Sequence, residues 1–213
     1  YSPYDMVYSE IYGMNQVSVQ DVLHILEKNG VTVEQVIQLP YIRDDVFNYL
    51  PVTEINRDFG CDYQIQEGEF LNLFQYNLED GYEHNIQPVS TVTISGDRKL
   101  QSVGTDVKIL FNQNPTFADK TLIINDSDFE KLSADITGSA GIANLFQFQN
   151  WKDSYAGVCE VKEYLQESNQ LNEDEQTYYE LSSKVEKYQD AKKSGQFLLF
   201  LMAFEIGRAS CRE

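Results

Sequence analysis

The spacing of apolar residues predicts short helices in the first part of the chain. In residues 18–30, Val19, Val22 and Leu26 recur at steps of three and four, which is typical of a helix with one apolar face. Ser18 is suited to cap the start of this helix, and Gly30 is suited to end it. The pattern therefore predicts a capped amphipathic helix near the N-terminus.

Alternating or short apolar runs predict strands elsewhere. The predicted strands cover residues 5–12, 31–39, 62–66, 90–94, 100–103, 106–111, 121–125 and 143–151. Further helices are predicted over residues 68–78, 127–136 and 152–167. Pro40 is expected to end a strand, Gly104 to form a turn, and Ser127 with Glu130 to open a helix as a capping box. Together these elements predict an α+β fold with a mixed sheet and short helices.

The C-terminal part of the chain is predicted to form one long helix. Asn172 is expected to cap it, and the acidic residues 173–175 suit the positive end of the helix dipole. Apolar positions then follow at alternating steps of three and four, which is typical of a packing seam. The residues of this predicted coupling stalk are Tyr178, Leu181, Val185 and Tyr188.

Residues 197–204 read FLLFLMAF, an unbroken apolar run. A bilayer-spanning helix needs about 20 apolar residues, so we interpret the run as the start of a truncated transmembrane helix. Residues 207–213 are polar and aperiodic, and we interpret them as a foreign read-through tail. The predicted organisation is an extracellular α+β domain over residues 1–172, and a stalk helix with the start of a transmembrane helix over residues 173–206.

The charge of the chain is strongly negative. Acidic residues number 34 against 16 basic ones, which gives a formal net charge of −18. Such a polyanion repels phosphate backbones, so we exclude nucleic-acid binding. The same field attracts cationic partners such as basic peptides. The alternative interpretation is that the charge only maintains solubility.

The sequence contains little that points to catalysis or metal binding. The three cysteines, Cys61, Cys159 and Cys211, have no zinc-site spacing, and free thiols are favoured over a Cys61–Cys159 disulfide. His24 is expected to be an ordinary helix residue, and His84 lies in a polar turn that matches no known cation loop. We predict that the chain is not an enzyme and has no catalytic, metal or cofactor site.

Asp126 and Asp128 flank a predicted helix start, and we interpret both as capping residues. The capping role accounts for both of them. They therefore do not change the prediction that the chain lacks an active site.

Three stretches give the chain a family resemblance. They read PYDMVYSE with VQDVLHILEKNGV, then TLIINDSDFEKL, then YYELSSKVEKYQDAKKSGQFLLFLMAF. In this order they resemble the large extracellular domain of FtsX-like ABC-transporter permeases, in the bacitracin-type antimicrobial-peptide group of Gram-positive bacteria. Together the stretches touch roughly a third of the chain, and none is a catalytic motif.

The resemblance implies partners as well as a place in the cell. Permeases of this group pair with a separate cytoplasmic ATPase subunit, and many signal to a sensor histidine kinase. Their extracellular domain is thought to engage the peptide, or its complex with a lipid-linked wall precursor, outside the cell membrane. Lys192 and Lys193 precede the apolar run where the positive-inside rule expects cytoplasm, but that rule is weak for long domains. The alternative is a surface adhesin or solute-binding module anchored by one membrane helix.

Overall fold

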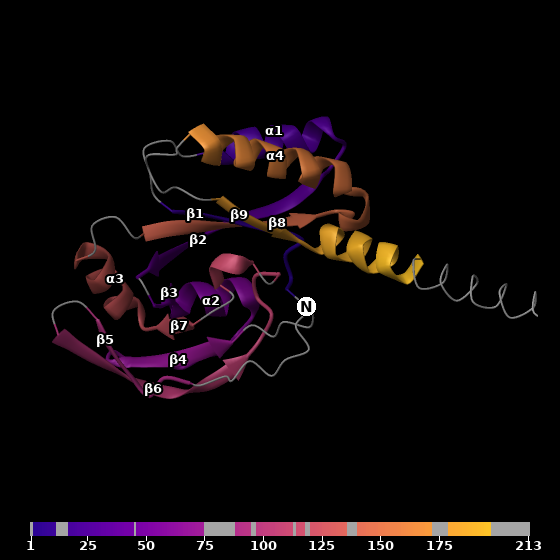
Figure 1. Ribbon diagram of the computed structural model, residues 1–213. Helices are drawn as coiled ribbons and strands as arrows, with labels where there is room; N and C mark the ends of the chain where they lie inside the picture. Colours follow the sequence, from indigo (N-terminus) through magenta and orange to yellow (C-terminus); the bar gives the residue numbers. More distant parts are fainter. Residues whose placement is uncertain are drawn as a thin grey trace, which may run out of the picture.

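The computed structural model describes residues 2–11, 17–44, 46–74, 88–94, 97–112, 114–117, 120–135, 140–171 and 179–196. Nine strands form one curved sheet in the order β5-β6-β4-β7-β3-β2-β8-β1-β9 (Figure 1). The strands are β1 Met6–Ile11, β2 Val33–Arg43, β3 Asn48–Pro51, β4 Glu69–Phe74, β5 Thr91–Ile94, β6 Arg98–Val107, β7 Thr121–Ile124, β8 Ala140–Phe148 and β9 Tyr179–Ser183. The β3–β7 and β4–β6 pairs are parallel and the other pairs antiparallel, so the predicted mixed α+β sheet is confirmed.

Helices cover both faces of this sheet. They are α1 Val19–Lys28, α2 Val52–Phe59, α3 Asp126–Asp135 and α4 Tyr155–Leu171, with the 3-10 turns η2 Pro115–Phe117 and η3 Trp151–Asp153. Residues 184–196 are also helical. The predicted start and end of α1 are confirmed, because the Ser18 side chain accepts from the Gln20 N–H and Gly30 has a φ of 73°.

The alternation of side chains along β2 sorts the core onto two faces. Val36 packs with the cluster beneath α1 and α4, and Ile42 with the cluster beneath α3. Leu39 and Tyr41 point the other way, into the cluster around α2. Since successive residues of a strand face opposite sides, α1, α4 and α3 cover one face of the sheet and α2 covers the other.

Several predicted elements are confirmed by the structure. Residues 5–12 match β1, residues 90–94 match β5, and residues 121–125 match β7. The predicted strand over residues 143–151 and the helix over 152–167 match β8 and α4, with shifts at their ends. These elements carry local signals, since each shows a short apolar run, an alternation of apolar and polar residues, or helical spacing.

The helix predicted over residues 68–78 is wrong over residues 69–74, which form β4, and its last four residues lie outside the described part of the chain. This strand lies inside the sheet between β6 and β7. Phe70 and Leu73, which point to opposite faces, are both fully buried. A strand buried on both faces is apolar on both sides, and its spacing then imitates that of a helix.

The turn predicted at Gly104 is also wrong. One strand, β6, runs through this position, and the pairing with β4 shifts register there as in a β-bulge. Likewise, Pro40 does not end a strand, because β2 continues to Arg43. The strand predicted over residues 62–66 is absent, since the Asn56 side chain bonds both the N–H and the C=O of Tyr63.

The start of α3 is capped differently from the prediction. Asn125, not Ser127, is the cap, because its side chain accepts from the Ser127 N–H at 3.0 Å. Asp126 accepts instead from the Thr53 N–H at 3.1 Å. The Asp128 carboxylate is completely buried, accepts from the Gly68 N–H at 2.6 Å and pairs with an arginine of β6, so the capping interpretation of these two aspartates is wrong.

Candidate functional site: the root of the C-terminal helix

The sheet ends in a strand where the sequence predicts a helix. Strand β9 pairs antiparallel with β1, with Leu181 opposite Tyr8 and Ser183 opposite Met6. The single long helix predicted from Asn172 onward is therefore wrong over residues 179–183. The free edge of β1 offers main-chain hydrogen bonds to this segment, and such tertiary pairing overrides helical spacing.

The C-terminal helix begins directly at the end of β9. The Glu186 N–H donates to the Ser183 hydroxyl at 3.2 Å, and that hydroxyl donates to the Glu186 carboxylate at 3.0 Å. This Ser-x-x-Glu pair stops the helix from unravelling at its first turn. We call residues 183–188, where the helix joins the domain, the helix root. The Ser-x-x-Glu spacing was a readable signal that the sequence interpretation missed.

A buried ion pair ties the helix root to two strands. The Lys184 ammonium group donates to Asp5 Oδ1 at 2.8 Å, and the Lys184 N–H donates to the Asp5 carbonyl at 2.9 Å. The other carboxylate oxygen of Asp5 accepts from the Phe148 N–H at 2.7 Å. Asp5 is only 5% exposed. One aspartate thus joins the start of β1, the end of β8 and the start of the helix.

Apolar contacts continue along the root. Val185 is 1% exposed and lies in the same apolar cluster as Val158 of α4. Leu181 packs against this cluster as well. Tyr188 meets Trp151 of η3 edge-on, with ring centroids 5.7 Å apart. These contacts fix the direction in which the helix leaves the sheet.

Polar contacts bind the root to its neighbours as well. The Lys162 ammonium group of α4 donates to Glu186 at 2.7 Å, and this hydrogen bond raises the pKa of Lys162. Lys152 lies over the ring of Tyr188, 5.9 Å from its centroid. Residues 190–196 are exposed, and the helix projects away from the sheet (Figure 1).

The four predicted stalk residues do not all lie in the helix. Tyr178 lies outside the described residues. Leu181 lies in β9, so it does not belong to a helical seam. Val185 and Tyr188 both lie in the helix root and face the domain. Asp5, which the sequence interpretation did not single out, is joined to the root only by the fold.

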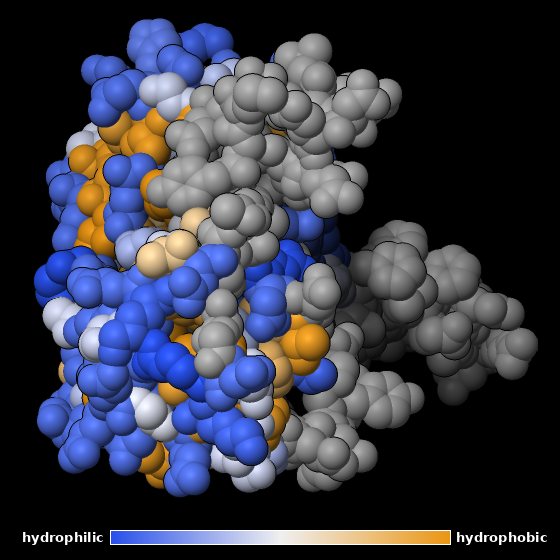
Figure 2. Space-filling model, turned by 90° about the vertical axis from the view of Figure 1, so that its left-hand side faces the viewer, coloured by the Kyte–Doolittle hydropathy of each residue, from blue (hydrophilic) through white to orange (hydrophobic). Residues whose placement is uncertain are grey.

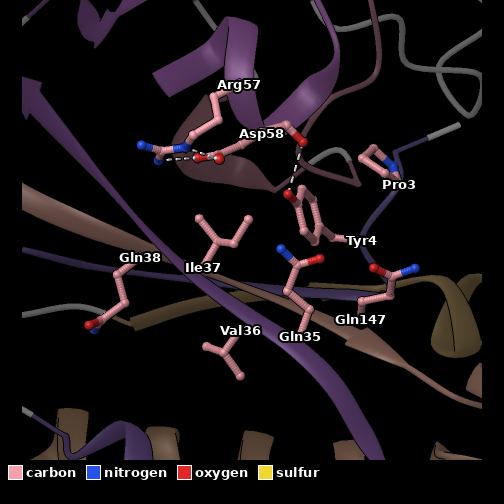
Figure 3. A pocket seen from close by; sticks show the side chains of 9 residues that line it. All are labelled: Pro3, Tyr4, Gln35, Val36, Ile37, Gln38, Arg57, Asp58 and Gln147. Carbon is pink, nitrogen blue, oxygen red and sulfur yellow. Dashed lines mark hydrogen bonds and ion pairs between the residues drawn. The ribbon is translucent and has the colours of Figure 1, made fainter. Parts of the chain in front are cut away.

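A polar groove of about 550 Å³ lies on another part of the domain, between β2 and the end of α2. The Tyr4 hydroxyl donates there to the Asp58 carbonyl at 2.9 Å (Figure 3). Partial burial, with the Asp58 carboxylate next in effect, raises the pKa of Tyr4 to about 12. The Arg57 guanidinium donates to the Asp58 carboxylate at 2.7 Å.

The described residues contain no group of three or more side chains that could hold a metal ion. Cys61 and Cys159 are both free thiols, as predicted, and both are partly buried, Cys61 against the cluster around α2 and Cys159 in α4. His24 is exposed on α1, whereas His84 and Cys211 lie outside the described residues. Nothing in this part of the chain offers a metal centre.

The surface and the helices bear on the membrane prediction. On the face drawn in Figure 2, hydrophilic side chains predominate and apolar ones form small groups between them. None of the described helices is long and apolar enough to cross a membrane. The apolar run at residues 197–204 and the tail at 207–213 lie outside the described residues.

Comparison with protein-family models finds no match, and comparison with curated proteins finds no related sequence. A search of solved structures finds the crystal structure of a "Putative Lipoprotein from Bacillus anthracis". It is 9% identical to this chain, and the match covers 75% of this chain and 92% of the other, with a TM-score of 0.46. This likeness is too remote to carry an argument about location or activity.

Proposed function

We propose that the chain is the extracytoplasmic domain of an FtsX-like ABC-transporter permease that senses, exports or confers resistance to cell-wall-directed antimicrobial peptides. The observation that carries this proposal is the helix root. A helix that leaves a sheet through a cap, a buried ion pair and an aromatic contact is suited to transmit movement, whereas a passive tether needs none of these.

The physical argument for coupling concerns stiffness. To tilt the helix independently of the sheet, Lys184 must leave the buried carboxylate of Asp5, which costs free energy because an unpaired charge then stays out of water. Val185 must also leave the apolar cluster. A tilt of the helix is therefore expected to move β1 and β8 with it.

The peptide part of the proposal is supported by charge. A net charge of −18 attracts cationic, amphipathic peptides and speeds their approach. In this proposal the ATPase is a separate cytoplasmic subunit, a sensor histidine kinase is a further partner, and the domain lies outside a Gram-positive cell membrane. A peptide bound to a lipid-linked wall precursor is an equally suitable ligand.

The coupling test uses the parent gene in its own cell. The double substitution Lys193→Gly/Ser194→Pro breaks the exposed helix, because proline removes a helical hydrogen bond. It leaves the number of residues in the chain unchanged. The matched control, Lys193→Ala/Ser194→Ala, keeps the helix. We expect the first to abolish peptide resistance and the second to retain it at equal membrane abundance. Equal resistance in both strains contradicts coupling.

The sequence that flanks the chain tests the transporter class itself. The proposal requires several further membrane segments in the parent protein and an ATPase gene beside it. A parent with one membrane segment and no such gene supports the alternative, a surface adhesin or solute-binding module.

A further inference from the structure

Strand β2 has an open edge along most of its length. Strand β8 pairs with it from Val33 to Ile42, but β3 pairs with it only at Ile42 and Arg43. Strand β3 ends at Pro51, which in this register reaches no further along β2 than Pro40, so it cannot cover residues 33–39. Residues 33–39 therefore have no described strand on this side of β2.

The main chain of two residues faces this open edge. The Asp44 N–H donates to the Phe47 carbonyl at 3.0 Å, so the main-chain groups of Asp44 point toward β3. Those of Ile42, two residues earlier and paired with Tyr49, point the same way. Amide groups alternate in direction along an antiparallel strand, so those of Gln38 and Val36 point the same way. Outside the β2–β8 pair, no hydrogen bond among the described residues reaches the main chain of either residue.

The polar groove runs along this edge. All of residues 35–38 line it, and Arg57 and Asp58 of α2 line its other side (Figure 3). In Figure 3, Ile37 points toward α2 and Val36 points away from it. Because neighbouring side chains of a strand face opposite sides, a groove lined by both of them includes the strand's edge, and its lining by a residue of β8 extends it over the sheet face beneath α2.

The side chains around the groove suit a basic peptide. Gln35, Gln38 and Gln147 offer amides that both donate and accept hydrogen bonds. Of the charged residues, Arg57 and Asp58 line the groove and pair with each other at 2.7 Å, while Glu54 beside them also pairs with Arg57 at 2.6 Å, so the three groups together carry one negative charge. The net charge of the chain adds to this field.

We infer that the open edge of β2 binds an extended, basic peptide, which adds to the sheet as a further strand beside Val36 and Gln38. Main-chain hydrogen bonds to these two residues supply the attachment, and the strongly negative field of the chain favours basic side chains. The inference rests on the proposed function only in taking a peptide as the ligand.

The direct test is hydrogen exchange on the 213-residue chain. The probe is a capped eight-residue peptide of alternating lysine and valine, and the controls are its fully N-methylated form and a glutamate–valine peptide. We expect the lysine peptide to slow exchange at the Val36 and Gln38 amides at least about tenfold, with Ile37, which faces β8, unchanged. Neither control should produce this effect.

A pair of variants at one position tests the same edge. Gln38→Pro removes the outward N–H, which a strand edge tolerates, whereas Gln38→Thr removes the same side chain and keeps the N–H. Both lose the 3.0 Å bond from the Gln38 side chain to Asn144. We expect proline to weaken peptide binding at least about tenfold more than threonine does, with similar melting temperatures.

Each contrary result overturns the inference. These results are unchanged exchange at Val36 and Gln38 under saturating peptide, equal binding of the N-methylated or acidic peptide, or equal binding by the two variants. Slow exchange at both amides before peptide is added, together with a dimer in sedimentation, assigns the edge to a second copy of the chain instead. Failure here leaves helix coupling intact, because that is measured by resistance in cells.

Discussion

The carboxylate of Asp5 and the ammonium group of Lys184 lie 2.8 Å apart, although 179 positions separate them in the chain. Their side chains are 6% and 21% exposed, so water screens the pair only weakly. The pair joins the residue before β1 to the start of the last described helix. It is the contact on which the proposed coupling depends most.

Removing the lysine and removing the aspartate of this pair should lower the free energy of unfolding by different amounts. Lys184→Met leaves a buried carboxylate without its cation, and we expect it to lower the free energy of unfolding by about 3–5 kcal/mol. Asp5→Asn keeps an acceptor for the Phe148 N–H and leaves a lysine that can turn toward water, so the expected loss is about 1–3 kcal/mol. Urea denaturation measures both.

The control for the lysine is Lys192→Met, on the exposed part of the same helix. We expect this variant to stay within about 0.5 kcal/mol of the wild type, as surface substitutions do. If Lys184→Met and Lys192→Met unfold at the same urea concentration, the buried pair does not hold the root.

The cap at Ser183 makes a second prediction about the root. Ser183→Ala removes the acceptor for the Glu186 N–H, so we expect a loss of about 1 kcal/mol and faster hydrogen exchange at residues 185–187. Ser194→Ala, at an exposed position inside the helix, makes the same chemical change without a cap and should not destabilise. Equal exchange in the two variants contradicts the capping role.

The Trp151–Tyr188 contact makes a third prediction. Tyr188→Ala removes the edge-on aromatic contact and should cost about 0.5–1.5 kcal/mol in unfolding free energy. Tyr188→Phe keeps the ring and should cost almost nothing, since Tyr188 is 41% exposed. Tryptophan fluorescence should report the loss directly, because Trp151 is the one tryptophan of the sequence. Similar spectra and stabilities for the two variants rule out the contact.

Local signals account for what the sequence predicts correctly. Ser18 and Gly30 each act within one turn of the end of α1 that they define. The short apolar run at residues 121–125 predicts a buried strand without reference to any distant residue. The failures occur where distant partners decide. The spacing around Phe70 predicts a helix, but this segment pairs with β6 and β7 and forms a strand. Residues 179–183 likewise form a strand because they pair with the edge of β1.

The site follows the same rule. Val185 and Tyr188 could be chosen from spacing, and Ser183 with Glu186 could have been chosen from a known capping pattern. Asp5 has no local signal, because its role comes from Lys184 and Phe148 at the other end of the chain. Sequence reasoning on one chain therefore finds the helix side of the root and misses the sheet side.

The buried Asp128 makes a fourth prediction, outside the root. Its carboxylate joins α3 to Gly68 before β4 and to Arg98 of β6, so Asp128→Asn leaves the arginine without its buried partner. Asparagine keeps an acceptor for the Gly68 N–H, and Arg98, which is 33% exposed, can turn toward water, so we expect a loss of about 1–3 kcal/mol in unfolding free energy. Asp135→Asn, exposed at the end of the same helix, is the control and should change little. Equal melting temperatures contradict a structural role for Asp128.

The last prediction concerns pH and the pair Tyr63–Asp106. The Tyr63 hydroxyl donates to the Asp106 carboxylate at 2.6 Å, and this bond is the main cause that lowers the pKa of Asp106 below its ordinary value of 3.8. A carboxyl group whose pKa is lower in the folded state adds stability above its unfolded pKa. That stability is lost as the pH falls through the folded value.

Tyr63→Phe removes this hydroxyl and keeps the ring under Lys108, whose ammonium group lies 5.0 Å from the ring centroid. We therefore expect the variant to be less stable than the wild type at pH 6, with a difference that shrinks as the pH falls below about 4. Carbon-detected NMR titration should also show a higher pKa for Asp106 in the variant. A stability difference that stays constant between pH 6 and pH 2 contradicts this linkage, because lost packing alone does not depend on the protonation of Asp106.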